Sequence, residues 1–441
     1  MGKQKIDLMI FIEHVARELD IATALKYLII NRYGLSVEIA SIVAAHGRKE
    51  ALNKFEPRVA ALPFFYSTTA PGPQDILLTY PHVLCVNLAY EQIFSQINQI
   101  FKAPKDTYSK NYVLHHAWGN FFSRYLQEFG VPSENIFVNG NPSYALYQSP
   151  YATFYPDKSE LAQRYSIDTN KRWVLIPENY GAAFYDVDRL NEYLKYGLQD
   201  AYKYRDFALA SFREAIIWWQ QAANLDGLEL IIRPRPAVSG DVFLKTCVDR
   251  IGVIPEHLHI IKEGTVREWI LSSDIVMSSY STTLIEAAVA EKPVYMLEPI
   301  PFPPYIQADW YGFVPRLQSQ QDFLTVLSNN GLGDSYQKLQ TWACESMLNP
   351  PDVIDNLAHW LAAICRAETH LPPAADAASL PVRPQNRLQR VLKDPARTVK
   401  SVWARFSGKN TESEKVIGHE QDAFSSQDVA ERIKRWEKIL G

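Results

Sequence analysis

The chain has 441 residues, of which 47% are hydrophobic and 12% are aromatic, and its formal net charge is −4. A chain of this length is too long to fold around a single hydrophobic core of ordinary size, so we expect two domains followed by a tail. The charge balance gives no general attraction to nucleic acid, and we expect no nucleic-acid partner. The cysteines are scattered without a Cys-x-x-Cys pair, which predicts neither a zinc site nor a disulfide framework and fits a reducing compartment.

Apolar stretches are too short for membrane insertion. The run near the start of the chain has about six apolar residues before charges appear, whereas roughly 20 are needed to span a bilayer. It therefore indicates a buried first strand rather than a signal peptide. We expect a cytoplasmic protein whose body does not enter the membrane.

Residues 1–150 show apolar runs alternating with amphipathic segments, which is typical of a parallel sheet covered by helices. One helix is expected over residues 17–33 and another over 120–129, the latter ended by Gly130 and Pro132. This predicts an N-terminal Rossmann-like domain that receives the acceptor. Its strands are expected at residues 7–13, 36–44, 59–66, 83–88, 111–115 and 136–139.

A second α/β series follows a junction rich in Pro, Tyr, Ser and Asp at residues 141–170. We expect a donor-binding Rossmann-like domain over 151–366, with a helical region at 186–224. Two such halves facing a central cleft define the GT-B plan, and a single large doubly wound sheet is the alternative. The strands of this second half are expected at residues 173–177, 228–233, 258–262, 274–278 and 293–297.

The C-terminal part is predicted to be a linker at 367–386 followed by a basic amphipathic tail at 387–441. Residues 387–409 contain seven Lys or Arg residues and a single acidic residue, Asp394. Such a segment can lie on an anionic membrane, which predicts a peripheral contact with the cytoplasmic face of the inner membrane. The alternatives for this segment are a solvated basic linker and a helix packed back on the protein. A terminal helix over 428–440 is expected to bind a partner or a second copy.

The clearest motif is a buried strand that runs into a hydroxyl-rich turn and then a helix, at residues 274–288. Hydroxyls and free N–H groups at such a turn hold phosphate without a metal. Glu286, about one turn into the helix, is placed to accept hydrogen bonds from ribose hydroxyls. The alternative is an ordinary capped helix. The residues predicted to hold phosphate are Ser279, Ser281, Thr282 and Thr283.

A second motif is the strand ending Ile-Ile-Arg-Pro-Arg-Pro, which places Arg233 and Arg235 at a carboxyl strand end. These guanidinium groups are predicted to clamp the donor phosphate or carboxylate. Lys262 and Glu263 follow the next strand and are expected to flank the nucleobase. Solvated arginines in a surface turn are the alternative.

These two motifs resemble those of bacterial GT-B enzymes that use cytidine-activated donors, such as sialyltransferase-like and Kdo-transferase-like capsule enzymes, and more distantly polyol-phosphate polymerases. The N-terminal residues Glu13 to Asp20, with 87–92, 117–119 and 140–142, are similar to the bacterial surface carbohydrate biosynthesis family. Together the resemblance covers roughly residues 5–310. One position departs from it: Arg235 stands where the pattern has histidine. Arginine neutralises phosphate but cannot act as a general acid.

Candidate catalytic carboxylates follow strands whose ends meet at one edge. Glu13 ends the first strand and ranks first as the base that accepts the acceptor proton. Glu18 and Glu91, the latter followed by Gln92, lie on the same side, and Glu178 ends the first strand of the second half. Capping of a helix or a turn is the alternative role for these acids.

The acceptor sugar is expected to contact side chains suited to proton transfer or to packing on a pyranose ring. No Asp-x-Asp pair follows a strand, so we predict no metal site, and we expect no cofactor beyond a nucleotide-sugar co-substrate, based on cytidine. The predicted acceptor-binding residues are His14, Arg17, His115, His116 and Trp118.

These residues together predict a metal-independent glycosyltransferase. It would move a CMP-activated ulosonic acid, such as Kdo or a sialic-acid-like sugar, onto a surface polysaccharide or lipopolysaccharide. The alternatives are a UDP- or GDP-sugar donor, a CDP-polyol phosphotransferase, or a non-enzymatic scaffold that binds nucleotide or glycan. The partners are then the nucleotide-sugar donor and a glycan or glycolipid acceptor.

Overall fold

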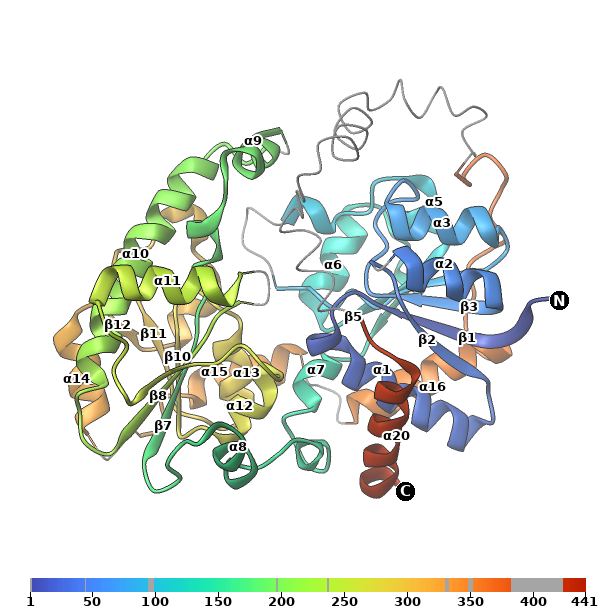
Figure 1. The fold of residues 1–441 in the computed structure, drawn as a ribbon. Coiled ribbons are helices and arrows are strands. Elements are labelled where there is room, and N and C mark those ends of the chain that lie inside the picture. Colours follow the sequence, from blue (N-terminus) through green and yellow to red (C-terminus); the bar gives the residue numbers. More distant parts are fainter. Residues whose placement is uncertain are drawn as a thin grey trace, which may run out of the picture.

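The computed structural model describes residues 2–43, 45–93, 99–195, 197–235, 238–329, 333–347, 352–381 and 423–441. In these residues the strands form two separate parallel sheets of six strands each. Figure 1 shows the two α/β units side by side, with helices packed around each sheet. The two-unit prediction is confirmed, and the single-sheet alternative is wrong.

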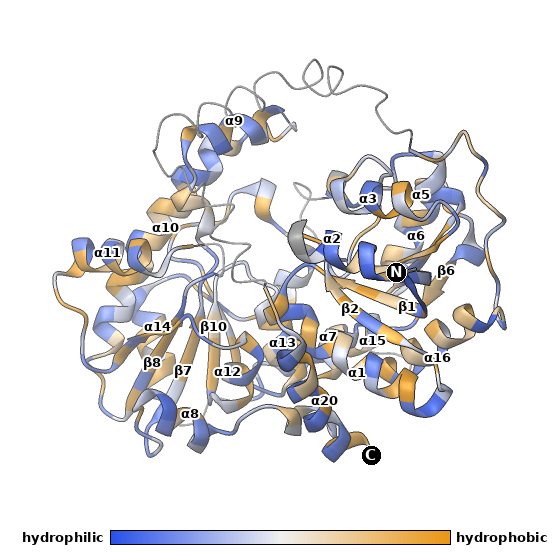
Figure 2. Ribbon diagram, turned by 45° about the vertical axis from the view of Figure 1, so that its right-hand side comes forward, coloured by the Kyte–Doolittle hydropathy of each residue, from blue (hydrophilic) through white to orange (hydrophobic). Residues whose placement is uncertain are grey.

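The first sheet has the order β2-β1-β3-β4-β5-β6. Strand β1, next to the edge strand β2, pairs with β2 and β3, so that Leu8 lies between Val37 and Val59. Strands covered on both faces are apolar almost throughout, which is why their runs were visible in the sequence (Figure 2). The strands are β1 Gln4–Ile12, β2 Val37–Ser41, β3 Phe55–Leu62, β4 Leu84–Asn87, β5 Val113–Ala117 and β6 Ile136–Val138. The helices are α1 Val15–Tyr33, α2 Ala45–Lys54, α3 Pro71–Thr79, α5 Thr107–Asn111 and α6 Asn120–Glu128.

The second sheet has the order β12-β11-β10-β7-β8-β9, so the chain reverses its direction of travel across the sheet between β7 and β10. β12 was not predicted, because two residues are too short for a periodic pattern. The strands are β7 Arg172–Pro177, β8 Leu228–Arg233, β9 Leu258–Ile260, β10 Ile275–Ser278, β11 Val294–Leu297 and β12 Arg316–Leu317. The helices are α8 Lys158–Tyr165, α9 Val187–Lys195, α10 Ala201–Ala222, α11 Gly240–Ile251, α12 Val266–Ser272, α13 Thr283–Val289, α14 Gln320–Ser328 and α15 Gln337–Met347.

The chain crosses between the units twice. It leaves the first unit through α7 (Pro142–Ala145) and the short helix η3 (Tyr151–Phe154), and it returns through α16 (Val353–Arg366). Although α16 falls in the segment that was assigned to the donor domain, it packs against α1, α7 and β3. Part of the expected linker also lies on the first unit, where His370 contacts Asn135 at 3.0 Å.

The terminal helix α20 (Ser426–Leu440) packs back on its own chain, against α1 and η3. Trp436 is fully buried, stacks on Phe154 with 4.1 Å between ring centroids, and donates from Nε1 to the Thr23 hydroxyl at 3.1 Å. One side of this helix is thus covered by its own chain, and the expected binding of a partner or a second copy stays a prediction for its exposed side. The basic stretch 387–409 lies outside the described residues, and so its expected membrane contact stays a prediction.

One buried carboxylate joins the two units and α20. Asp20 of α1 is 2% exposed and accepts hydrogen bonds from Arg432 of α20 at 2.9 Å and from the Tyr155 hydroxyl at 3.0 Å. Arg267 of α12, itself 2% exposed, approaches the same carboxylate at 3.4 Å. Because a buried charge without a partner is very costly, these groups fix one another's positions.

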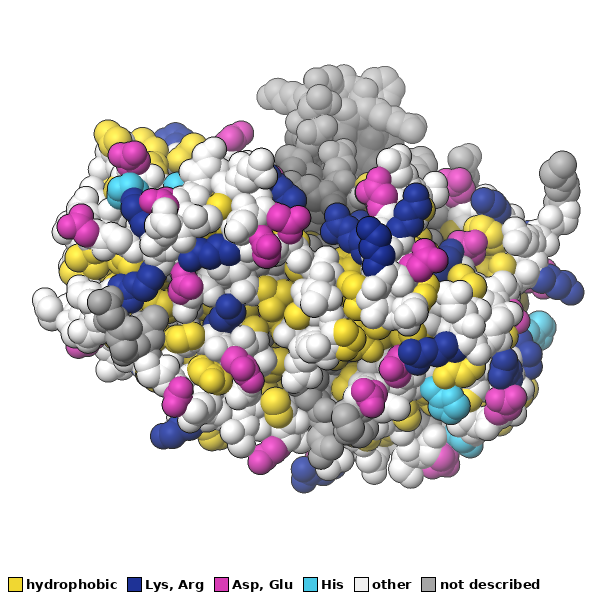
Figure 3. Space-filling view, turned by 90° about the horizontal axis from the view of Figure 1, so that it is seen from below, with side chains coloured by type: hydrophobic (Ala, Val, Ile, Leu, Met, Phe, Trp, Pro, Cys, Tyr) yellow, Lys and Arg dark blue, Asp and Glu magenta, His cyan; other side chains and the backbone are white. Residues whose placement is uncertain are grey.

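None of the described helices is long and apolar enough to cross a membrane. On the face shown in Figure 3, acidic and basic side chains are interspersed.

Substituting Asp20→Asn is expected to lower the free energy of unfolding by about 3–5 kcal/mol, because it leaves two arginines near a neutral group. The shift in the urea unfolding midpoint measures this effect. Asp249→Asn is the matched control, since Asp249 is an exposed partner of Lys245, and it should change stability by less than about 0.5 kcal/mol. A similar small change in both variants would contradict the structural role of Asp20.

Candidate active site

The loops of the second sheet that are best placed to bind a ligand lie at the point where the strand order reverses. The carboxyl ends of β7 and β10 are neighbours there, and they lead into Glu178 and Asn179 on one side and into Ser279 and Tyr280 on the other. The Asn179 amide donates to the Tyr280 carbonyl at 3.1 Å, which ties the two loops together. Ligands of open α/β sheets bind in this position.

The buried side chain of Glu178 holds the loops at this edge in place. It is 4% exposed, and its carboxylate accepts from the backbone N–H of Tyr180 at 2.6 Å and of Arg235 at 2.7 Å. Burial raises the pKa of Glu178, while these two N–H groups act in the opposite direction. Both oxygens are therefore occupied in shaping the loops, an arrangement that does not favour the predicted catalytic role.

Arg235 presents its guanidinium at the surface of the same edge. Nη1 donates to the Asn179 side chain at 2.8 Å, and the aliphatic stem passes over Gly181, where an added Cβ would lie 3.2 Å from Cδ. Among the described residues, Asn179 is the only hydrogen-bond acceptor of this guanidinium. Its remaining N–H groups are suited to an anionic group such as a phosphate or carboxylate.

Arg233 lies differently from the prediction. Its buried guanidinium donates to four carbonyls in the loop after β9, with distances from 2.7 Å to 3.3 Å. Burial lowers its pKa to about 10. Lys262 also donates to a carbonyl, that of Val238, at 2.7 Å, and Glu263 is exposed. In this arrangement Arg233 and Lys262 hold loops in place, so their predicted contacts with the donor are not favoured by the geometry.

The hydroxyl-rich turn after β10 divides into two parts. The Ser281 hydroxyl accepts from the Thr283 N–H at 3.3 Å and its hydroxyl at 2.8 Å, which is the capping role considered above, and Thr282 is exposed. Ser279, by contrast, is 1% exposed. Within the described part of the chain, the Ser279 hydroxyl is paired with that of Tyr180, and the Tyr280 hydroxyl with that of Tyr204, although neither pair has the geometry of a regular hydrogen bond. Ser279 therefore already has a partner inside the edge, and its phosphate contact stays a prediction.

Glu286 on α13 reaches toward the other unit. The Tyr147 hydroxyl donates to its Oε2 at 2.5 Å. Burial raises the pKa of Glu286, and the positive charges of Arg267 and of Arg17 oppose that rise. Tyr147 belongs to the segment that leaves the first unit and Arg17 to α1, so a contact and a charge from the first unit both act on this carboxylate.

The first unit contributes a charged cluster, which we call the Arg17 cluster: Glu13, Arg17, Glu18, Glu91 and Lys102. Arg17 contacts Glu91 at 2.6 Å, Glu18 at 2.9 Å and Glu13 at 3.5 Å, and Lys102 pairs with Glu91. Desolvation alone would raise the pKa of Glu91, but Arg17 and Lys102 hold it far below its usual range. These distances place Glu13, Glu18 and Glu91 around Arg17, while the predicted roles of the four residues stay predictions.

Glu13 differs from the other acids of the cluster. Glu18 is fully buried, and it accepts from the Glu13 backbone N–H at 2.7 Å, as an acid at the start of a helix does. The Glu13 side chain is 27% exposed and lies 3.9 Å from His14 Nε2. Burial raises the pKa of Glu13, and the charges of Glu18 and Glu91 add to this rise. A partly exposed carboxylate with a raised pKa suits proton transfer near neutrality.

Three of the predicted acceptor residues are buried in the first unit. His115 and His116 are both 0% exposed, and Trp118 is 5% exposed and packs on Tyr144. The Asn87 amide oxygen accepts from the N–H groups of Phe65 and Ala89, so its Nδ2 donates to His115 Nδ1, and Nε2–H donates to the Ser109 carbonyl at 2.8 Å. These side chains support the edge rather than face a ligand, which corrects the expectation for all three.

The structure adds residues that the motifs did not indicate. Tyr147 and Arg267 surround Glu286, Lys102 completes the Arg17 cluster, and Asn179 holds Arg235. The sequence signal for Tyr147 is the run of tyrosines at residues 144–155 within the junction 141–170, but such a run does not show which of them contacts Glu286. Within the described ranges, no three His, Cys, Asp or Glu side chains are arranged to hold a metal ion.

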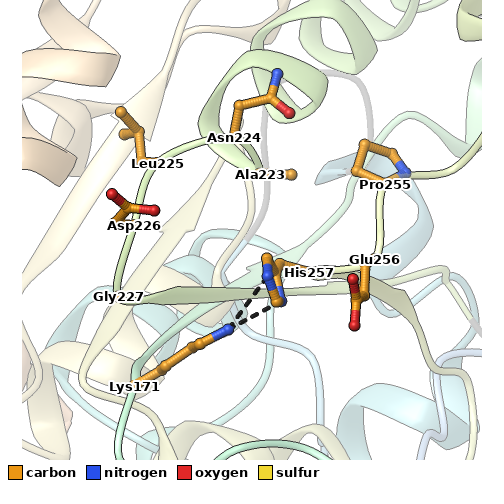
Figure 4. A pocket seen from close by; sticks show the side chains of 9 residues that line it. All are labelled: Lys171, Ala223, Asn224, Leu225, Asp226, Gly227, Pro255, Glu256 and His257. Carbon is orange, nitrogen blue, oxygen red and sulfur yellow. Dashed lines mark hydrogen bonds between the residues drawn. The ribbon is translucent and has the colours of Figure 1, made fainter.

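A pocket of about 430 Å³ lies at the opposite edge of the second sheet, at the amino ends of β7, β8 and β9 (Figure 4). Lys171 and His257 at its wall contact each other at 3.0 Å, and both approach the buried Glu229. Ligands of this sheet type bind at the other edge, so we place no active site here.

The chain has two Rossmann-like units, each with polar residues at the carboxyl ends of its parallel strands. This arrangement defines the GT-B architecture. No protein-family model matches the chain, and no curated protein matches its sequence. Among solved structures, the chain is similar to a UDP-N-acetylglucosamine 2-epimerase with a TM-score of 0.52 and 11% identity, over 85% of this chain and 100% of that one. It is also similar to S. aureus MnaA bound to UDP, with a TM-score of 0.51 and 10% identity, over 84% of this chain and 100% of that one. These likenesses establish the fold.

The buried His115 predicts a pH effect on stability. Burial lowers its pKa to about 4, whereas the unfolded chain takes up this proton near the ordinary value of 6.5. Stability should therefore fall as the pH is lowered through this window, and His115 should account for about 2 kcal/mol of the loss between pH 7 and pH 5.

His115→Asn keeps an acceptor near the Nδ1 position. Urea unfolding at pH 7 and pH 5 should show a smaller pH-dependent loss in this variant than in the wild type. His82→Asn is the matched control, because His82 is exposed, and it should retain the wild-type pH dependence. An unchanged loss in His115→Asn would show that His115 does not titrate as its burial predicts.

Proposed function

We propose that the chain is a glycosyltransferase that takes a sugar from a nucleotide-activated donor. The observation that carries this proposal is the hydrogen bond that Tyr147, on the segment leaving the first unit, donates to Glu286 at the reversal edge of the second sheet, where the charge of Arg17 from the first unit also acts on the same carboxylate. One unit thereby offers a carboxylate and hydroxyls suited to a nucleotide, and the other offers a partly exposed base. Transfer between two substrates needs both groups at one place.

The donor is proposed to lie along the reversal edge of the second sheet. Glu286 would accept hydrogen bonds from the ribose, and Ser279 and Thr282 would contact phosphate. Arg235 would neutralise the phosphate of a leaving nucleotide, a role that metal-dependent transferases give to a cation. A CMP-ulosonic acid fits this set, because its carboxylate adds a second anion, and the resemblance of the two motifs to cytidine-dependent enzymes supports this choice.

The acceptor is proposed to approach from the first unit, where the Glu13 carboxylate would take the proton of the attacking hydroxyl. Arg17 lies 3.5 Å from Glu13 and would limit the build-up of negative charge around it. We propose a bacterial surface polysaccharide or lipopolysaccharide as acceptor. The basic residues 387–409 would then bring the enzyme to the inner membrane that carries such acceptors.

A second candidate is an epimerase acting on a UDP-sugar. The likeness to solved UDP-N-acetylglucosamine 2-epimerases over most of this chain supports it. The two candidates differ in what they consume: an epimerase converts a nucleotide sugar without any acceptor, whereas a transferase releases the nucleotide only when sugar is transferred or hydrolysed.

Nucleotide binding is the first test. Calorimetry with CMP, CDP, UMP, UDP and GDP should give measurable binding, strongest for cytidine nucleotides, and Arg235→Ala should weaken binding by about tenfold or more through the loss of a charge-assisted contact. Arg172→Ala is the control, because Arg172 lies at the opposite edge of the same sheet. A preference for UDP would move the proposal to a uridine donor, and no binding at all would reject it.

The role of Glu13 is tested by Glu13→Gln. Loss of the base should reduce turnover about 100-fold or more, with nucleotide affinity changed less than about twofold. Wild-type activity should fall as the pH is lowered through the Glu13 pKa, which lies above the usual glutamate value. Glu38→Gln, which removes the partner of Lys26 away from this edge, should retain full turnover. Unreduced turnover in Glu13→Gln would assign the base to another residue.

A further inference from the structure

Tyr147 lies on the segment that carries the chain out of the first unit, just after α7. It is 4% exposed, and its hydroxyl donates to Glu286 Oε2 at 2.5 Å. The two residues are 139 positions apart and belong to different parts of the fold. The contact therefore links the crossing segment directly to the helix α13 at the reversal edge.

The surroundings of Tyr147 leave it little freedom. The guanidinium carbon of Arg267 lies 5.5 Å from the centre of the Tyr147 ring, and Arg267 is itself held by Asp20 and by the Tyr155 hydroxyl, the latter at 3.1 Å. The ring is thus packed beside a fixed charge. Its hydroxyl donates to one oxygen of Glu286, and within the part of the chain that the structure describes no hydrogen bond reaches the other oxygen, Oε1, which is thus available to a ligand.

We propose that Tyr147 is a positioning residue that orients Glu286 for recognition of the donor ribose. This assignment rests on the proposed function, because it takes Glu286 to be the ribose contact. A carboxylate that is fixed through one oxygen presents the other in a single direction, so the ordering cost on binding is lower. Without the hydroxyl, Glu286 can rotate, and hydrogen bonds to the 2′-OH lose their preferred geometry.

The hydroxyl also affects the charge of Glu286. Hydrogen bonding to the charged form favours ionisation, and the groups that act with it are Arg267 from α12 and Arg17 from α1. Tyr144, buried on the same crossing segment, is the other titratable neighbour. Removing only the Tyr147 hydroxyl should leave these groups in place and shift the ionisation of Glu286 to higher pH.

The test is Tyr147→Phe, which removes one oxygen and keeps the ring. Binding of CMP and of 2′-deoxy-CMP, or of the uridine pair if UDP is preferred, is measured by calorimetry between pH 5 and pH 8. The wild type should prefer the ribonucleotide by about tenfold or more. In Tyr147→Phe the preference should fall to about twofold or less, should stay below the wild-type value throughout this pH range and should be smallest at its acidic end, with the affinity for the deoxynucleotide unchanged.

Two further variants separate position from charge. Tyr144→Phe is the matched control, since Tyr144 is a neighbouring buried tyrosine, and it should keep the wild-type preference. Glu286→Asp retains the charge but draws the carboxylate away from Tyr147, so it should lose the preference at every pH. Glu286→Asp also tests the assignment if Tyr147→Phe does not fold.

The outcomes are distinct. Ribonucleotide preference and pH dependence that stay as in the wild type in Tyr147→Phe, or a preference retained in Glu286→Asp, would overturn the assignment of Tyr147 while leaving nucleotide binding intact. Failure of the wild type to bind any nucleotide would instead reject the proposed function, and with it this assignment.

Discussion

The buried carboxylate of Asp20 is the interaction on which the arrangement of this molecule depends. It receives Arg267 from the second unit and Arg432 from the terminal helix; Asp20 and Arg267 are both buried from water, and the half-buried Arg432 lies over them. A charge in such a place must keep its partners. The two sheets and α20 therefore have one favourable relative position, set by a few side chains rather than by a broad apolar contact alone.

That position also builds the candidate active site. Asp20 and Arg17 both belong to α1, so the helix that anchors Arg267 also carries the Arg17 cluster. On the other side, Arg267 lies beside Tyr147 and near Glu286. The same buried arginine thus stabilises the contact between the units and sets the electrostatics of the carboxylate proposed to bind ribose, which connects the packing of the fold directly to its chemistry.

The strands could be predicted because strands covered on both faces are apolar throughout, and Glu13 and Glu91 could be grouped because residues that follow parallel strands meet at one edge. What a polar side chain does there could not be predicted. The Arg233 guanidinium donates to four loop carbonyls, and His115 forms hydrogen bonds with Asn87 and Ser109 inside the first unit. These partners come from other segments of the chain and follow no periodic pattern in the sequence. The same holds for the contact of Tyr147 with Glu286.

The docking of α20 has a consequence for how the chain acquires its structure during synthesis. Trp436 and Thr23 are 413 residues apart, so the surface of α1 that receives the indole is made early and stays uncovered until a further 413 residues have been synthesised. Until then, the apolar ring of Phe154 and the Asp20 carboxylate lack their final covering. A contact between such distant residues forms late in folding, and the apolar surface left open before it forms is exposed to aggregation.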